Sequence, residues 1–236
     1  MTNLGVVVPA RNEADLLPTC LAALCHARTA LRQLAPQVSV RLVVVLDSCV
    51  DASAQVAQSH PQIELVSVDA GSVGGARQAG IDHLLRSGPA VLGDWFACTD
   101  ADSAVPADWL ITHYQASRTG IDLLLGSVRP ERGRLSQEDF EEWQARHDLG
   151  DGHGHVFGAN LGFGARTLLA TGGFRPLSVH EDVDLTSRTR AAGLTVFATG
   201  ESPVITSARR TGRTPAGFAS YLAREFGPLP DQAAAG

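Results

Sequence analysis

The sequence contains no lysine, so every basic side chain other than histidine is an arginine. This absence excludes lysine-based chemistry, including the lysine of a Walker phosphate-binding loop. The glycine spacing GxGxxG is also missing, so neither ATP hydrolysis nor a dinucleotide cofactor is indicated. The formal net charge is −6 at pH 7, without a basic stripe. An acidic chain of this kind is not expected to bind nucleic acid.

The four cysteines, Cys20, Cys25, Cys49 and Cys98, form no CxxC pair and no zinc-binding spacing. Cys20 and Cys98 lie in apolar patterns, which predict buried thiols. Because no signal peptide precedes the first strand, we expect a reducing, cytoplasmic location. No apolar run approaches the ~20 residues of a membrane-spanning helix, so the sequence predicts a soluble protein with at most peripheral membrane contact.

The first half of the chain alternates short apolar runs with helical patterns. Alternation of this kind predicts an α/β fold in which successive strands pair in parallel, with right-handed crossovers. At 236 residues, the chain suits one sizeable α/β domain or two small ones. Strands are predicted over 4–10, 40–47, 63–69 and 94–100, and helices over 14–34, 50–60, about 74–85 and from about Pro106 onward.

The regular alternation of strands and helices ends after a further apolar run at 121–128. The second half is predicted to contain an acidic helix over 136–148 capped by Ser136, a glycine-rich segment over 150–164, a helix over 181–193, and short strands at 194–199 and 203–207. We interpret the chain as one domain with a nucleotide-binding half at about 1–105, an acceptor-binding half at about 106–226 and a flexible tail at 227–236.

Polar residues follow each of the first four predicted strands. In an open parallel sheet, ligands bind beyond the carboxyl ends of the strands, so these residues are expected to line one cleft. The segments are PARNE after the first strand, LDSCVD after the second, DAGSVGGAR after the third and TDAD after the fourth.

Each segment suggests a chemical role. Asp47 could accept hydrogen bonds from a base edge or a ribose, or it could cap the following helix. The helix opened by Gly74 and Gly75 could offer free N–H groups to an anion, with Arg77 adding a positive charge. Asp100 and Asp102 supply hard oxygen ligands, which suit Mg²⁺ or Mn²⁺ bound together with substrate phosphates.

A further acidic group, VHEDVDL, opens the helix predicted over 181–193. Acidic side chains in a first turn are favoured by the helix dipole alone, without any catalytic role. A carboxylate there could also act as a general base if it faces the cleft. The residues themselves leave these two interpretations open.

Taken in order, these segments resemble family 2 glycosyltransferases of the GT-A fold, a mostly parallel central sheet with a Rossmann-like first half flanked by helices. The resemblance runs over about residues 4–207. It implies transfer of a sugar from a nucleoside diphosphate sugar, with Mn²⁺ or Mg²⁺, to an acceptor hydroxyl. The resembling segments are VVVPARNEADLLPTCLAAL, VVVLDSCVDAS, VGGARQAGI, CTDADS, GANLGFGA, GGF and EDVDL.

The resemblance also implies roles for individual residues. Asp102 corresponds to the metal-binding carboxylate of a DxD motif, and Asp100 to the carboxylate that meets the donor's ribose or sugar and shares the metal site. Asp182 corresponds to the catalytic base, with Glu181 beside it. Nucleotide contacts are implied at Pro9, Ala10, Arg11, Glu13, Asp47, Gly75 and Arg77, and acceptor-side contacts at Gly158, Ala159, Asn160, Gly172 and Gly173.

The sequence departs from the family pattern in two places. After the second strand a single carboxylate, Asp47, stands where the family usually has two, so uridine and guanosine donors both remain open. No histidine follows His180, whereas a related retaining branch often places a metal-binding histidine late in the chain. This absence favours transfer with inversion.

Some features carry no assigned role at this stage. For His153 and His155 we favour a mobile loop over acceptor binding. For the segment Arg209–Arg213 we favour a phosphate-binding lid, with a solvated face, contact with an anionic acceptor or contact with a membrane surface as alternatives. The acceptor itself, whether saccharide, lipid or small molecule, is not defined. Two other functions remain open, a sugar-phosphate nucleotidyltransferase and a non-catalytic nucleotide-sugar binding module.

Overall fold

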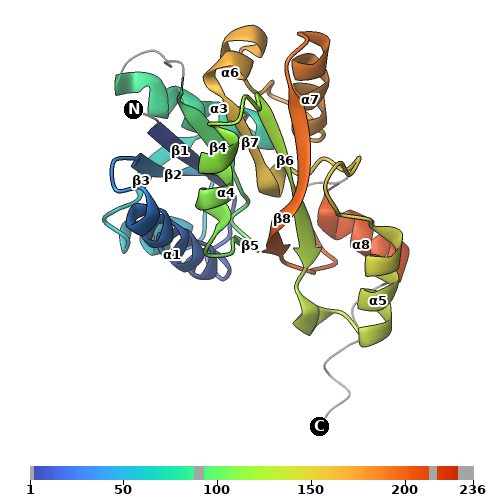
Figure 1. Ribbon diagram of the computed structural model, residues 1–236. Helices are drawn as coiled ribbons and strands as arrows, with labels where there is room; N and C mark the ends of the chain where they lie inside the picture. The colour runs from blue at the N-terminus through green and yellow to red at the C-terminus, as the bar shows by residue number, and fades with distance from the viewer. Residues whose placement is uncertain (1–2, 88–92, 213–216, 228–236) are drawn as a thin grey trace.

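The computed structural model describes residues 3–87, 93–212 and 217–227, which are organised around one eight-stranded mixed sheet (Figure 1). The strand order is β3-β2-β1-β4-β7-β6-β8-β5. The strands are β1 (Asn3–Ala10), β2 (Ser39–Asp47), β3 (Glu64–Val68), β4 (Trp95–Cys98), β5 (Ser103–Ala104), β6 (Leu123–Pro130), β7 (Leu161–Gly164) and β8 (Val196–Thr206).

The pairing differs between the two halves of the sheet. Strands β3, β2, β1 and β4 are parallel throughout, as the alternating pattern predicts. Strand β7 then pairs antiparallel with both β4 and β6, and β8 pairs parallel with β6. The tail predicted at 227–236 lies outside the described residues, apart from Gly227.

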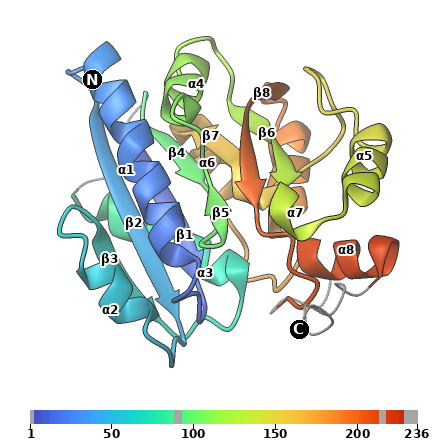
Figure 2. The same ribbon diagram turned by 90° about the horizontal axis from the view of Figure 1, so that it is seen from below.

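Helices cover both faces of the sheet, as the two views show (Figures 1 and 2). Alternate residues of β1 point to opposite faces, so Val6 and Val8 pack with the helices of one layer and Val7 with those of the other. The helices are α1 (Leu17–Leu34), α2 (Ser53–Gln58) and α4 (Trp109–Ala116) in the first layer, α3 (Val73–Leu84), α6 (Ala165–Thr171) and α7 (Glu181–Ala191) in the second, and α5 (Gln137–Arg146) and α8 (Phe218–Phe226) beside the second half.

Helix α5 begins as its sequence predicts. The Ser136 hydroxyl accepts a hydrogen bond from the backbone N–H of Asp139 at 3.0 Å, which satisfies one of the free amides of the first turn. Helix α4 begins at Trp109, three residues after Pro106, so the proline precedes the helix rather than occupying its first turn.

The two short strands predicted at 194–199 and 203–207 form one strand, β8. The segment Gly200–Pro203 has the composition of a turn, but Ser202 adopts a positive φ of 49° and the register against β6 shifts between Gly126 and Val128. This irregularity lets the chain continue along β6 instead of reversing.

The end of β8 fastens the turn that follows β4. Strand β5 pairs antiparallel with β8, and the Ser103 hydroxyl donates to the hydroxyl of Thr206 at 2.9 Å. One residue further on, the backbone N–H of Ser207 donates to the carbonyl of Asp102 at 3.1 Å. Two segments about a hundred residues apart therefore hold one turn in place.

Among the described residues, no helix combines the length and the apolar character that crossing a membrane requires. All four cysteines are free thiols, and Cys20 and Cys98 are buried as predicted.

Candidate active site

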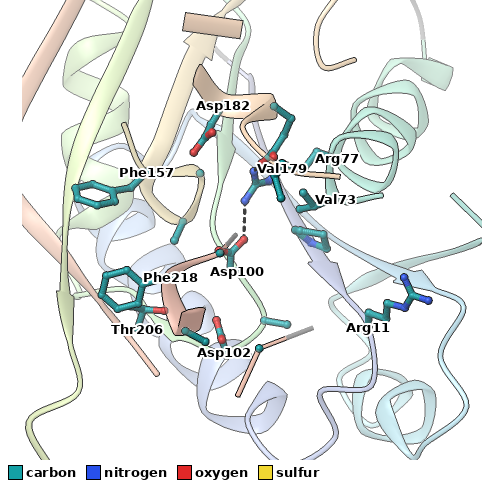
Figure 3. A pocket seen from close by; sticks show the side chains of 18 of the residues that line it. Arg11, Val73, Arg77, Asp100, Asp102, Phe157, Val179, Asp182, Thr206 and Phe218 are labelled. Carbon is teal, nitrogen blue, oxygen red and sulfur yellow. Dashed lines mark hydrogen bonds and ion pairs between the residues drawn. The ribbon is translucent and has the colours of Figure 1, made fainter. Parts of the chain in front are cut away.

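A cleft of about 600 Å³ opens at the carboxyl ends of β1, β2 and β4 (Figure 3). This volume lies within the usual range of ligand sites, about 300–1,000 Å³. All four polar strand ends reach this cleft, contributing Pro9, Ala10, Arg11 and Glu13 from the first, Asp47 from the second, Gly71, Ser72 and Arg77 from the third, and Asp100 and Asp102 from the fourth.

Asp47 lines the cleft from the end of β2 and is 4% exposed. Its Oδ1 accepts hydrogen bonds from the backbone N–H groups of Ala70, at 2.8 Å, and Gly71, at 3.1 Å. Asp47 does not cap α2, since the N-cap position of that helix is Ala52 and the N–H of Ser53 donates to Asp51. Asp47 thus fixes the loop after β3, and that loop forms part of the cleft wall.

The N-terminus of α3 is already occupied by protein groups. Ser72 caps the helix by accepting the N–H of Gly75 at 3.2 Å, and the N–H of Gly74 donates to the carbonyl of Leu177 at 3.2 Å. A side chain at Gly74 would collide with the backbone carbonyl of Arg175. Gly74 therefore allows close packing of α3 against the segment before α7, whereas Gly75 packs against Ser72 and Ala70 and does not line the cleft.

Arg77 lies in a buried group that we call the inner cluster: Arg77, Asp100 and Glu181. Its guanidinium is 2% exposed; Nη2 donates to Asp100 at 2.6 Å and Nη1 donates to Glu181. Burial alone lowers the pKa of Arg77, but Asp100 and Glu181 outweigh it and raise that pKa above its usual value. We expected Arg77 to meet phosphate; its charge is instead used between two carboxylates.

The packing of this cluster explains one of the predicted acceptor-side glycines. A methyl group on Gly158 would overlap the Arg77 guanidinium, so a glycine there gives the arginine its space. Gly158 and Ala159 line the cleft.

Asn160 and Gly173 do not line the cleft. The Asn160 side chain donates to the carbonyls of Ser127 and Ser202 and accepts the Trp109 indole N–H at 2.8 Å, so it ties β6, β8 and α4 together. Gly173 follows Gly172 in a turn where both have positive φ, 75° and 82°.

A second group of charges, which we call the outer cluster, comprises Arg209, Asp102 and Glu13. The Arg209 Nη2 contacts Asp102 Oδ2 at 2.9 Å and Glu13 Oε1 at 2.8 Å, while Nη1 donates to Glu13 Oε2 at 2.9 Å. The Arg209 side chain is 22% exposed, compared with 2% for Arg77. Sequence reasoning placed Arg209 on a lid but did not find its pairing with the predicted metal ligand.

The electrostatic setting of Asp102 is unfavourable for its negative charge. Burial, and then the neighbouring charge of Asp100, raise the pKa of Asp102 to about 6, although Arg209 acts in the opposite direction. A carboxylate in this setting gains from any additional cation.

Among the described residues, no group of three or more histidine, cysteine, aspartate and glutamate side chains is arranged to hold a metal. Mg²⁺ and Mn²⁺ commonly use one or two carboxylates and take their remaining ligands from phosphates and water. Asp100 and Asp102 offer such carboxylates on the cleft surface, and Arg209 already occupies a cation position at Asp102. The donor set therefore fits a metal held jointly with a phosphorylated ligand.

The acidic residues that open α7 diverge in three directions. Glu181 is buried against Arg77, where burial raises its pKa and Arg77 opposes that rise. Asp184 pairs with Arg188 at 2.6 Å and with Arg175 at 3.1 Å, and it does not line the cleft. Asp182 lines the cleft, and Figure 3 shows it on the far side of Asp100 from Asp102. Glu181 also lines the cleft, but its carboxylate is buried and paired with Arg77, so Asp182 presents the more accessible carboxylate to a ligand.

One side of the cleft carries rings that sequence reasoning largely missed; we call His147, His155, Phe157, Phe218 and Tyr221 the aromatic wall. The rings of His155 and Phe157 stack with centroids 5.7 Å apart. The wall combines three segments, the end of α5, the glycine-rich loop and α8. A signal was present in the spacing of Phe218, Leu222 and Phe226, which places three apolar side chains on one face of a helix.

The two histidines of the glycine-rich loop differ from each other. His155 lines the cleft, and burial together with His147 and His153 lowers its pKa, which favours the neutral ring. His153 is 8% exposed and lies behind it, with ring centroids 6.0 Å apart. His155 therefore belongs to the lining of the cleft, and acceptor binding by this residue stays a prediction.

Hydrogen bonding orients His147 within the aromatic wall. Its Nδ1 donates to the carbonyl of Trp143 at 2.7 Å, because a carbonyl can only accept. In the neutral ring, Nε2 then accepts the Tyr221 hydroxyl at 3.2 Å. This bond ties α8 to α5.

Solved structures with a similar fold include glycosyltransferases. TarS 1–349 of S. aureus, in complex with UDP-GlcNAc, has a TM-score of 0.66 at 14% identity over 94% of this chain and 64% of that chain. The mannosyltransferase PcManGT of Pyrobaculum calidifontis, with GDP-Man and Mn²⁺, has a TM-score of 0.60 at 18% identity over 89% of this chain and 58% of that chain. The present chain thus spans less than two thirds of either.

Glucosyl-3-phosphoglycerate synthase of Mycobacterium tuberculosis, with Mn²⁺, UDP and glucosyl-3-phosphoglycerate, has a TM-score of 0.53 at 16% identity over 87% of this chain and 70% of that chain. No curated protein matches the sequence. The shared architecture is the GT-A fold, as predicted. The sequence model of glycosyl transferase family 2 matches residues 5–149, more than half of the chain, and the chain belongs to this family.

Proposed function

We propose that this protein transfers a sugar from a nucleoside diphosphate sugar to an acceptor hydroxyl, with a divalent metal and with inversion at the anomeric carbon. The observation that carries the proposal is the shared cleft of Asp100, Asp102 and Asp182. For the diphosphate to leave while the acceptor hydroxyl attacks, the metal–diphosphate site and the carboxylate that takes the proton must face the same ligand.

Asp182 is the proposed general base. Its carboxylate takes the proton of the acceptor hydroxyl while the oxygen attacks the anomeric carbon, on the face opposite the departing diphosphate. Glu181 and Arg77 hold the first turn of α7 beside Asp100 and so fix the position of Asp182. Glu181 is thus a positioning residue in this mechanism, because its carboxylate is committed to Arg77.

Asp102, with Asp100 beside it, would hold Mn²⁺ or Mg²⁺. The metal, when bound, neutralises the charge that develops on the leaving diphosphate. Similar structures carry Mn²⁺ together with GDP-Man or UDP, which supports the use of a divalent metal.

The donor is proposed to be uridine- or guanosine-linked. The similar structures contain UDP-GlcNAc, GDP-Man and UDP. Arg11 lies on the opposite side of Asp102 from Phe218 in Figure 3. Asp47 also lines the cleft, and it directly follows Leu46, the residue of β2 that pairs with Ala10 at the end of β1. We assign the nucleoside to this side.

The acceptor is proposed to lie along the aromatic wall, in the half of the chain that follows about residue 105. Phe157 lies near Asp182 and Phe218 lower in the same view, both on the side away from Arg11 (Figure 3). Ring faces favour flat or apolar parts of a ligand, and Tyr221 adds a hydroxyl. An acceptor on this side would present its hydroxyl to Asp182 across the leaving diphosphate.

The test begins with a panel of UDP- and GDP-sugars in Mn²⁺, assayed for slow release of the nucleoside diphosphate. Asp182→Asn is expected to lower transfer by about 10²–10⁴-fold, the usual contribution of a general base, with donor affinity nearly unchanged. Asp184→Asn is the matched control, since Asp184 lies on the same turn outside the cleft. Normal turnover by Asp182→Asn would remove Asp182 from the base role.

The same assay separates the other functions left open by the sequence. Release of pyrophosphate from a nucleoside triphosphate and a sugar phosphate would identify a nucleotidyltransferase. Donor binding in calorimetry without any turnover over the whole panel would identify a non-catalytic module. The stereochemistry of the product, read by NMR of the anomeric proton, decides between inversion and retention.

A further inference from the structure

Arg209 bridges two carboxylates that come from different strand ends. Its fork reaches Glu13, after β1, and Asp102, after β4, with the three contacts between 2.8 and 2.9 Å. The arginine comes from the segment after β8 and lines the cleft. The carboxylate proposed to bind the metal therefore already has a cation as its partner.

The two cations cannot share Asp102 without repulsion. Mg²⁺ binds carboxylate oxygens at about 2.0–2.1 Å and Mn²⁺ resembles it in its preference for oxygen, so a metal on Asp102 would lie beside the guanidinium. Like charges at such separation repel strongly where water is partly excluded. The side chain is 22% exposed, so an alternative position for it in the cleft is accessible.

Three other described arginines are poorly placed to bind the diphosphate at this point. Arg11 lines the cleft on the side that we assign to the nucleoside. Arg77 is buried and committed to Asp100 and Glu181. Arg210, next in the chain, turns away from the cleft and donates to the backbone carbonyl of Leu222. Arg209 remains, and its planar fork matches the geometry of phosphate oxygens.

We propose that Arg209 is the counter-ion that a divalent metal displaces from Asp102, and that the displaced guanidinium then binds the donor's diphosphate. The inference rests on the proposed function, because it assumes that metal and donor share this cleft. Metal and donor are then coupled: the metal alone competes with Arg209, whereas a diphosphate gives the arginine a new partner. By linkage each ligand strengthens the binding of the other.

The test measures binding rather than turnover. Mn²⁺ is titrated by calorimetry into the wild-type chain and Arg209→Gln at about pH 8, where carboxylates are ionised. Without nucleotide, the variant is expected to bind Mn²⁺ about tenfold more tightly, a difference of about 1.4 kcal/mol. With Mn²⁺ saturating, the variant is expected to bind UDP or GDP about tenfold more weakly. Tighter Mn²⁺ binding together with weaker nucleotide binding is the result expected if Arg209 moves from Asp102 to the diphosphate.

Two variants control the interpretation. Arg190→Gln removes the same charge at an exposed site on α7, outside the cleft, and should leave Mn²⁺ affinity unchanged. Arg209→Lys keeps the charge but loses the fork, so Mn²⁺ affinity should stay near the wild-type value while nucleotide affinity falls. Circular dichroism melts confirm that each variant is folded.

Equal or weaker Mn²⁺ binding by Arg209→Gln overturns the counter-ion role, and unchanged nucleotide binding overturns the transfer to diphosphate. Either result can coexist with loss of transfer in Asp182→Asn, and the proposed function would then stand without this inference. If the wild-type chain and Arg209→Gln both bind neither Mn²⁺ nor nucleotide, this inference and the proposed metal site fail together.

Discussion

Asp100 and Asp102 are two residues apart in one turn, yet they belong to clusters of different character. The inner cluster joins Asp100 to Arg77, a side chain with 2% exposure, and through it to Glu181 on α7. The outer cluster joins Asp102 to Arg209, with 22% exposure, and to Glu13. One arginine is enclosed by helix and sheet, while the other comes from the segment after the last strand.

The inner cluster is suited to keeping a fixed geometry, and the outer cluster is suited to exchanging its partners. Removing one partner of a buried ion pair leaves an uncompensated charge, so the inner cluster holds its geometry whatever ligand is present. A partly exposed pair contributes less to stability and can be replaced by a ligand at small cost. A metal-dependent transferase needs both, a fixed frame for its base and a carboxylate that can change partners.

Replacing the inner arginine should have the largest effect. Arg77→Met would leave Glu181 buried without a cation, and we expect it to lower the free energy of unfolding by about 3–5 kcal/mol. Urea denaturation followed by circular dichroism measures this loss. Arg77→Lys keeps the charge but loses the planar fork, so its free energy of unfolding should lie between those of the wild type and Arg77→Met. A melt of Arg77→Met that matches the wild type would contradict the buried, structural character of this cluster.

Replacing Asp102, the aspartate of the outer cluster, should instead raise the free energy of unfolding at neutral pH. The pKa of Asp102 is raised from 3.8 to about 6, so its stabilising contribution is complete below pH 3.8 and is lost as the pH rises through about 6. Asp102→Asn cannot ionise and should be more stable than the wild type above this pH, by about 1–3 kcal/mol at neutral pH. The gain should vanish near pH 4.

Unfolding free energies of both proteins across this pH range test the prediction. Metal-dependent donor binding should be lost in the same variant, because its proposed ligand is gone. An Asp102→Asn protein that is less stable than the wild type at neutral pH would mean that the pair with Arg209 outweighs the burial of the charge.

A smaller effect than that of Arg77→Met should follow from a glycine that packs against the inner cluster. Gly158→Ala would push a methyl group into the Arg77 guanidinium and should reduce stability by about 1–3 kcal/mol. Gly154→Ala is the control in the same loop, because a methyl group there meets nothing within 4 Å. Thermal melts of the two variants compare them directly, and equal melting temperatures would show that the arginine has room to move.

The parallel half of the fold could be predicted because its signals are local. The apolar runs before Asp47 and Asp100 are buried strands, and each is bounded by polar residues. The second half is harder to predict for physical reasons. Strand β7 has four residues, two of them glycines, and β8 contains Gly200 and Pro203, whose turn-like composition is overridden by pairing with β6.

The candidate site divides in the same way. The meeting of four strand ends in one cleft follows from parallel topology, and it could be predicted from the order of the segments. The partners of Arg77 and Arg209 could not, because Glu181 lies 104 residues after Arg77 and Glu13 lies 196 residues before Arg209. Only the folded chain shows that Arg77 meets carboxylates, where the motif suggested phosphate.

The ties between Ser103 and Thr206, and between Asp102 and Ser207, have a consequence for how the protein is made. During synthesis the chain emerges from its N-terminus, so strands β1 to β4 can pair while the ribosome is still translating the second half. The aspartate turn receives its fastening only when β8 has been added, about a hundred residues later. We therefore expect a nascent chain to gain its sheet early and its capacity for metal and nucleotide late.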